Sequence, residues 1–158
     1  MNATFYNLIL VTHIVGIILM AGATFIDYLT FKSFWSLFEK DQTKALVLRE
    51  ETSRFQKIMG FGMLLILLSG IGMMAYMHKV YGQQTWMQIK IGIVVLIIIN
   101  GLGIRRMLGT KLEKLLTEKN LPFDPKVFLG IKTKLTLVHI VQLTLFLSVF
   151  VLSVFKFN

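Results

Sequence analysis

Two histidines and one lysine lie inside runs of residues that are otherwise apolar: His13, His139 and Lys90. A polar side chain is costly in such a run, so each of them needs a partner or a function. Neutral imidazole is a common nitrogen ligand of iron, and two histidines on neighbouring helices can bind one haem from its opposite faces. His13 and His139 are therefore candidate metal ligands for haem b. The alternative is that each forms a hydrogen bond between helices or relays protons.

Lys90 also has two interpretations. A lysine near the end of an apolar run can extend its ammonium group to the lipid headgroups. The other interpretation is that the cation binds a haem propionate or the carboxylate of an acidic substrate. On this second interpretation Lys90 is a candidate cofactor-binding and catalytic residue.

A second group of metal-binding side chains lies in the stretch "MMAYMH", which contains Met73, Met74, Met77 and His78. Thioethers together with imidazole suit copper, although methionine is also a common packing residue. The alternative function is therefore a copper-handling or small-solute transport protein. His78 and Lys90 also remain alternatives to His139 as the second axial ligand of a haem.

Four apolar runs must position these residues, at about 5–25, 58–77, 86–104 and 135–155. Each approaches the ~20 residues that a helix needs to cross a bilayer, and backbone groups in lipid must be satisfied within a helix. We therefore predict an all-α integral membrane protein, a single domain over 1–158 with an up-down-up-down four-helix bundle. The chain has no cysteine, which excludes disulfides, thiolate-held iron–sulfur clusters and covalent c-type haem.

The formal net charge of +9 is concentrated in two of the connections between these runs. The basic residues there are Lys32, Lys40, Lys44, Arg49, Arg54 and Lys57 in the first, and Arg105, Arg106, Lys111, Lys114, Lys119, Lys126, Lys132 and Lys134 in the second. Basic connections lie on the cytoplasmic side, so we predict that runs 1–2 and 3–4 are joined there and that both termini lie outside. The charges then indicate contacts with anionic lipid rather than nucleic acid. The segment before the first run lacks basic residues, which favours a membrane span over a signal peptide.

The helices are expected to extend beyond the membrane. The segments "FKSFWSLFEK" and "KLEKLLTEK" can continue the first and third helices. Asp41 is a candidate N-cap for a helix that leads into the second run, and Asp124 with Pro125 is expected to begin the fourth.

Small and amide side chains indicate where helices meet. Close packing is the default interpretation of the small residues, either within the chain or against a second copy in a homodimer. They are Gly60, Gly62, Ser69, Gly70, Gly72, Gly92, Gly101 and Gly103. Asn100 and Gln142 are predicted to form hydrogen bonds between helices.

The depths of the two histidines in the membrane can be compared. At ~1.5 Å per residue, the Cα atoms of His13 and His139 are expected to differ in depth by about 9–12 Å. Because each imidazole extends away from the backbone, the two rings can lie closer together than the Cα atoms.

The order of these motifs resembles that of the HemJ-type protoporphyrinogen oxidase family. His13 followed by Ala21, Gly22 and Phe25 is similar to the family's first helix. The second and third helices are similar at a few further positions: Arg54, Met59, Gly70, Trp86 and Lys90. The wider relatives of this family include the copper-resistance D proteins.

The resemblance implies a protein of the bacterial inner membrane that binds b-type haem, with His13 and Lys90 as important residues. It also implies oxidation of a porphyrinogen, with electrons leaving through the membrane to a quinone-type partner. The chain departs from the family's pattern in two places: "IDYLTF" lacks a Pro-Arg pair, and "VHIVQL" replaces an acidic, proline-containing segment. These departures favour a simpler bis-histidine cytochrome over the enzyme.

Overall fold

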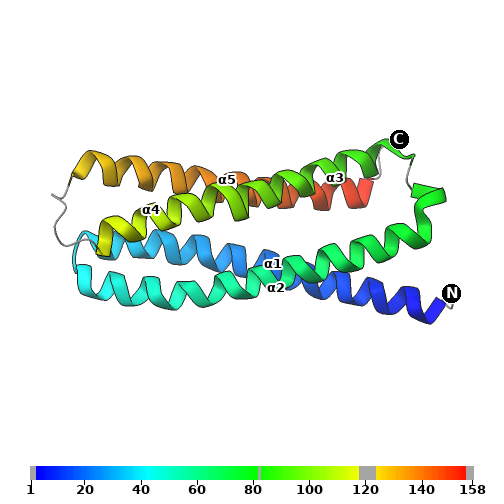
Figure 1. The fold of residues 1–158 in the computed structure, drawn as a ribbon, viewed down its shortest axis with the longest axis horizontal. Helices are drawn as coiled ribbons and strands as arrows, with labels where there is room; N and C mark the ends of the chain where they lie inside the picture. The colour runs from blue at the N-terminus through cyan, green and yellow to red at the C-terminus, as the bar shows by residue number, and fades with distance from the viewer. Residues whose placement is uncertain (1–2, 82, 118–123, 156–158) are drawn as a thin grey trace. The chain divides into compact units, whose positions relative to one another are not determined.

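A computed structural model describes residues 3–81, 83–117 and 124–155, except for the side chains of 51, 53, 54 and 78–81. These residues form α1 (Ala3–Phe38), α2 (Gln42–Tyr81), α3 (Thr85–Ile98), the π-helix η1 (Ile99–Arg105), α4 (Arg106–Thr117) and α5 (Pro125–Phe155). The chain divides into an N-terminal unit, Met1–Met87, and a C-terminal unit, Gln88–Asn158. Figure 1 shows the helices of each unit.

Long apolar helices account for almost all of the described residues. Four helical segments there are long and apolar enough to cross a membrane: Ala3–Phe38, Gln42–Met77, Thr85–Thr117 and Pro125–Phe155. Their large apolar side chains are widely exposed, for example Ile18 at 65%, Ile71 at 68% and Leu137 at 61%. Exposure on this scale is expected of a surface that faces lipid. The prediction of an all-helical chain with four apolar spans is confirmed.

Aspartates begin two of the long helices, as the sequence predicts. Asp41 Oδ1 accepts a hydrogen bond from the backbone N–H of Lys44 at 3.1 Å, in the first turn of α2. Asp124 Oδ1 accepts one from the N–H of Lys126 at 2.9 Å, and Pro125 is the first residue of α5. Each side chain satisfies a backbone donor that has no partner within the helix. The predicted N-caps are therefore confirmed.

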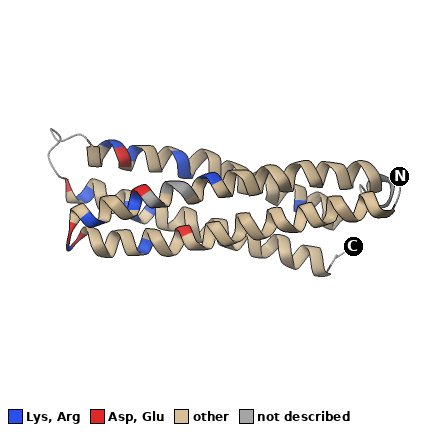
Figure 2. Cartoon of the chain, turned by 90° about the horizontal axis from the view of Figure 1, so that it is seen from below, with Lys and Arg blue, Asp and Glu red and all other residues tan. Residues whose placement is uncertain are grey.

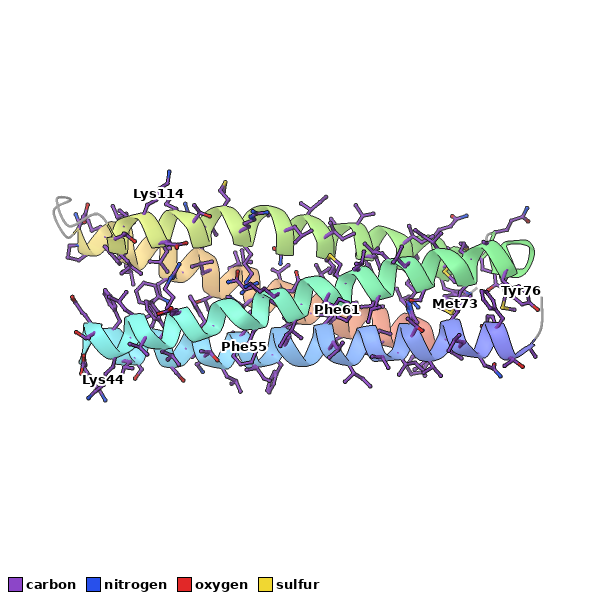
Figure 3. All side chains as sticks on the ribbon, turned by 60° about the horizontal axis from the view of Figure 1, so that its bottom comes forward. Lys44, Phe55, Phe61, Met73, Tyr76 and Lys114 are labelled. Atoms are coloured by element: carbon purple, nitrogen blue, oxygen red, sulfur yellow. The ribbon has the colours of Figure 1, made fainter. Side chains whose placement is uncertain are left out.

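The N-terminal unit is a hairpin of two antiparallel helices. Near the start of α1, the ring of Tyr6 lies 5.4 Å from that of Tyr76, which is labelled near the end of α2 in Figure 3. At the other end, the guanidinium of Arg49 lies 5.9 Å from the ring centroid of Phe34. Contacts along both helices therefore fix a single antiparallel register, which determines which residue of α2 each residue of α1 meets.

The backbones of α1 and α2 approach most closely at a pair of glycines. A Cβ atom added to Gly62 would lie 2.8 Å from the backbone nitrogen of Met20 and 3.0 Å from the carbonyl oxygen of Gly16. These neighbours are backbone atoms, which cannot move without shifting a helix. The close packing predicted for Gly62 is therefore found, whereas a Cβ at Gly60 would meet nothing within 4 Å.

Replacing Gly62 with alanine should force α1 and α2 apart. Overpacking of this kind costs about 1–3 kcal/mol, which should appear as a lower free energy of unfolding when helicity is followed during titration of the micelle with SDS. Gly60→Ala is the matched control, because it adds the same methyl group to open space and should be neutral or slightly stabilising. Equal effects of the two substitutions would contradict the close approach at Gly62.

In the C-terminal unit, α5 packs against η1 and α4. Its buried side chains recur at helical spacing along one stripe: Phe128, Ile131, Leu135, Val138, His139 and Gln142. The segment η1 interrupts the α-helical geometry between α3 and α4, a feature that the sequence analysis did not predict. Cβ atoms at Gly92 and Gly103 would meet nothing within 4 Å among the described residues, so the alternative of packing against a second copy stays a prediction at these positions.

Candidate functional site

The imidazole of His13 lies against α2. Its Nδ1 is 2.9 Å from Ser69 Oγ, and Ser69 is only 5% exposed. A Cβ atom at Gly70 would lie 3.7 Å from His13 Cε1, so the neighbouring glycine leaves room for the edge of the ring. The antiparallel register of the hairpin therefore brings His13 to Ser69, which the sequence pattern identifies only as a small packing residue.

The partners of Ser69 determine which nitrogen of His13 carries the proton. Ser69 Oγ forms hydrogen bonds with the carbonyl oxygen of Leu65 and, at 3.2 Å, with that of Ile66. Carbonyls only accept, and a hydroxyl has one hydrogen, so Ser69 donates to the backbone and accepts from His13. The ring is then protonated on Nδ1, and its lone pair lies on Nε2.

His139 has the same tautomer for a simpler reason. The side chain is 4% exposed, and its Nδ1 lies 2.7 Å from the carbonyl oxygen of Leu135, one turn earlier in α5. Because a carbonyl cannot donate, Nδ1 carries the hydrogen and the lone pair is again on Nε2. His13 and His139 thus carry the ring hydrogen on the same nitrogen. Nδ1 of His13 donates to a side chain of another helix, whereas Nδ1 of His139 donates to a backbone carbonyl of its own helix.

This pattern is typical of histidines that bind metals. A ligating histidine usually donates its second ring N–H to a backbone carbonyl or another oxygen, which fixes the ring orientation and makes the coordinating nitrogen more basic. Ser69 Oγ and the Leu135 carbonyl have this role towards His13 and His139. Each ring is therefore held in a fixed orientation through Nδ1.

Lys90 lies early in α3, at about 8 Å along the helix axis from Thr85, and is half-buried. It belongs to the C-terminal unit with His139, whereas His13 belongs to the N-terminal unit. The interpretation of Lys90 as a cofactor-binding or catalytic residue stays a prediction.

The candidate copper group lies where α2 loses its regular geometry. Met77 has φ −116° and ψ 15°, outside the helical range, although α2 continues beyond it to Tyr81. The copper interpretation of this group stays a prediction. Met73 and Met74 are half-buried, and the side chain of His78 lies outside the described residues.

Asn100 and Gln142 form the predicted contact between helices. Asn100 Nδ2 donates to Gln142 Oε1 at 2.7 Å and to the carbonyl oxygen of Val138 at 3.0 Å. This contact joins η1 to α5 one turn from His139. The prediction that both amides bond between helices is therefore confirmed.

The described part of the chain holds no group of three or more His, Cys, Asp or Glu side chains that could bind a metal ion. A haem iron needs fewer protein ligands, since the porphyrin nitrogens occupy its equatorial positions and one or two histidines suffice. Comparison with protein-family models, curated proteins and solved structures gave no match.

Proposed function

We propose that this chain is a membrane-embedded b-type haem protein in which His13 and His139 would hold the iron. The observation that carries this proposal is the shared hydrogen bond from Nδ1, which His13 makes to Ser69 Oγ and His139 makes to the carbonyl oxygen of Leu135. Burying a polar ring in a membrane span is costly, and coordination to iron would offset that cost.

The other parts of the chain have supporting roles. Ser69 and the Leu135 carbonyl orient the two rings, and apolar side chains of the spans would exclude water from a bound porphyrin. Lys90 is the proposed cation for a haem propionate or a substrate carboxylate. Bound haem would supply one-electron redox chemistry. By resemblance to the HemJ-type family, oxidation of a porphyrinogen is the proposed reaction if the protein is an enzyme.

The proposed orientation follows from the charges. Figure 2 shows lysine and arginine gathered near the α1–α2 connection of the N-terminal unit and along α4 and the start of α5 in the C-terminal unit. Cytoplasmic connections carry such an excess. We therefore propose a bacterial inner-membrane protein with its termini outside and these two connections in the cytoplasm.

An absorption spectrum of the purified protein tests the haem proposal directly. The protein is expressed with a haem precursor in the medium and extracted in mild detergent. A Soret band that shifts on reduction with dithionite is expected, together with haem that remains bound through size-exclusion chromatography. A monodisperse, helical sample with no visible absorption would overturn the proposal.

Replacing Ser69 with alanine should weaken haem binding about 10- to 100-fold, the usual cost of losing an outer partner of a metal ligand. The imidazole would also become a weaker donor, so the reduction potential should become more positive. Haem retention and a potentiometric titration measure these two effects. Ser69→Thr retains a hydroxyl and should recover part of both.

The control for this substitution is Ser148→Ala. Ser148 Oγ donates to the carbonyl oxygen of Thr144 at 2.9 Å, the same hydrogen bond to a preceding turn that Ser69 makes, but without a histidine. Haem affinity and potential should therefore stay at their wild-type values. An equal response to both substitutions would mean that Ser69 contributes only to helix stability.

A further inference from the structure

The positive charge of the chain is divided unequally between its two basic connections. Residues 26–57 include six basic and five acidic side chains, for a net charge of +1. Residues 105–134 include eight basic and three acidic side chains, for a net charge of +5. The excess of positive charge therefore belongs to the C-terminal unit.

Several basic side chains of the N-terminal unit interact with neighbours in their own unit. Lys44 forms an ion pair of 3.2 Å within the first turn of α2. Nζ of Lys32 lies 5.9 Å from the ring centroid of Tyr28, and the guanidinium of Arg49 lies at the same distance from that of Phe34. An acidic side chain and two aromatic rings thus stabilise these three cations.

Five basic side chains of the C-terminal unit differ in this respect. All five are exposed, and their side chains form no ion pair, hydrogen bond or ring contact with the described part of the chain. This C-terminal basic group consists of Arg106, Lys111 and Lys114 in α4 and Lys126 and Lys134 in α5. Because like charges repel one another, an anion bound among them would stabilise this end of the unit.

The fold brings members of this group from two helices to a similar depth. Asn100 Nδ2 donates to the carbonyl oxygen of Val138 at 3.0 Å, which aligns the two strands of helix at this point. Arg106 lies six residues after Asn100, and Lys134 lies four residues before Val138, which corresponds to about 9 Å and 6 Å along the axes. Figure 1 shows α4 and the start of α5 at the same end of this unit, so both displacements have the same direction.

Exposed apolar side chains lie next to these cations in the same helical spans. Leu102, at 54% exposure, and Ile104, at 42%, precede Arg106, while Leu137, at 61%, follows Lys134 by about one turn. A phospholipid has the same order of an anionic headgroup followed by apolar chains. A nucleic acid or a soluble acidic protein would match only the cations and would leave the apolar side chains uncovered.

We infer that the C-terminal basic group binds the headgroups of anionic phospholipids, whose acyl chains cover the exposed apolar side chains of the same spans. Juxtamembrane basic residues are attracted to anionic lipid in this way. The N-terminal connection has little net charge and should show no comparable preference. The inference rests on the membrane location of the spans and does not involve haem.

Native mass spectrometry of the delipidated full-length protein in mild detergent tests this inference. The protein is titrated with phosphatidylglycerol, or with phosphatidylcholine that has the same acyl chains, and wild-type protein should prefer phosphatidylglycerol. Each basic residue near an anionic surface contributes about 5-fold in affinity, so the combined variant Arg106→Gln, Lys111→Gln, Lys134→Gln should weaken phosphatidylglycerol binding on the order of 100-fold. Its binding of phosphatidylcholine should not change.

The matched control is the combined variant Lys32→Gln, Lys40→Gln, Lys44→Gln, which removes three charges from exposed positions of the N-terminal unit. This variant should retain the preference for phosphatidylglycerol. Equal losses in the two variants would show a response to net charge alone and would overturn the inference.

Two further results would also overturn it. One is wild-type protein that binds both lipids equally, a comparison that needs no variant and holds even if a variant fails to fold. The other is soluble glycerol phosphate that competes as well as the lipid, because the acyl chains would then contribute nothing. A preference for phosphatidylglycerol in protein without a Soret band would support this inference and overturn only the haem proposal.

Discussion

Replacing His13 with alanine is expected to abolish stable haem binding. The substitution removes the proposed axial nitrogen itself, so its effect should exceed the roughly 100-fold upper cost of losing an outer partner such as Ser69. The Soret absorbance and the haem-to-protein ratio after size-exclusion chromatography measure the loss. A variant that retains haem at the wild-type ratio would remove His13 as a ligand.

Two controls distinguish loss of a ligand from loss of folding. Thr12→Ala changes the adjacent residue, whose hydroxyl donates to the carbonyl oxygen of Leu8 in its own helix, and it should keep the wild-type spectrum. Addition of free imidazole to His13→Ala should restore a Soret band, because a small molecule can occupy the space of the lost ring and coordinate iron. Recovery of this kind is not expected if the substitution acts through unfolding.

Much of the fold was predictable because a lipid bilayer places the same requirements on each spanning segment, whatever the other segments are. A run of about 20 apolar residues is long enough to cross the bilayer, and its backbone groups must form hydrogen bonds within the run. Local sequence is therefore enough to identify a spanning helix, and the four long apolar helices were predicted. The N-caps at Asp41 and Asp124 were also local signals. In contrast, the kink at Met77 was not predicted, and neither was the π-helix Ile99–Arg105, whose asparagine and two glycines indicated only contacts between helices.

The candidate site was only partly predictable. His13 and His139 were identified because a histidine is conspicuous among apolar residues, and Asn100 with Gln142 for the same reason. The partner of His13 could not be identified, since Ser69 is recognisable only when the register of α1 against α2 is known. The same register explains why Gly62 lies at a helix crossing and Gly60 does not, although both are glycines in one short stretch.

The second large effect is expected at His139. Replacement with leucine fills most of the same volume but offers no nitrogen, so haem held by His13 should lose one axial ligand. Six-coordinate low-spin iron should then become five-coordinate and high-spin, with a broadened Soret band and a new high-spin signal in electron paramagnetic resonance. Haem content should fall less than in His13→Ala.

The hydrogen bond of His139 makes this result easier to interpret. Its Nδ1 donates to the carbonyl of Leu135, which the backbone N–H of α5 can also satisfy, so removing the ring leaves no buried acceptor without a partner. A change in spin state would therefore report the lost ligand rather than local unfolding. Val141→Ala, at an exposed position of the same helix, should leave the low-spin spectrum unchanged. An unchanged spectrum in His139→Leu would exclude His139 as the second ligand, and the same measurement on Lys90→Met would then test the remaining candidate in α3.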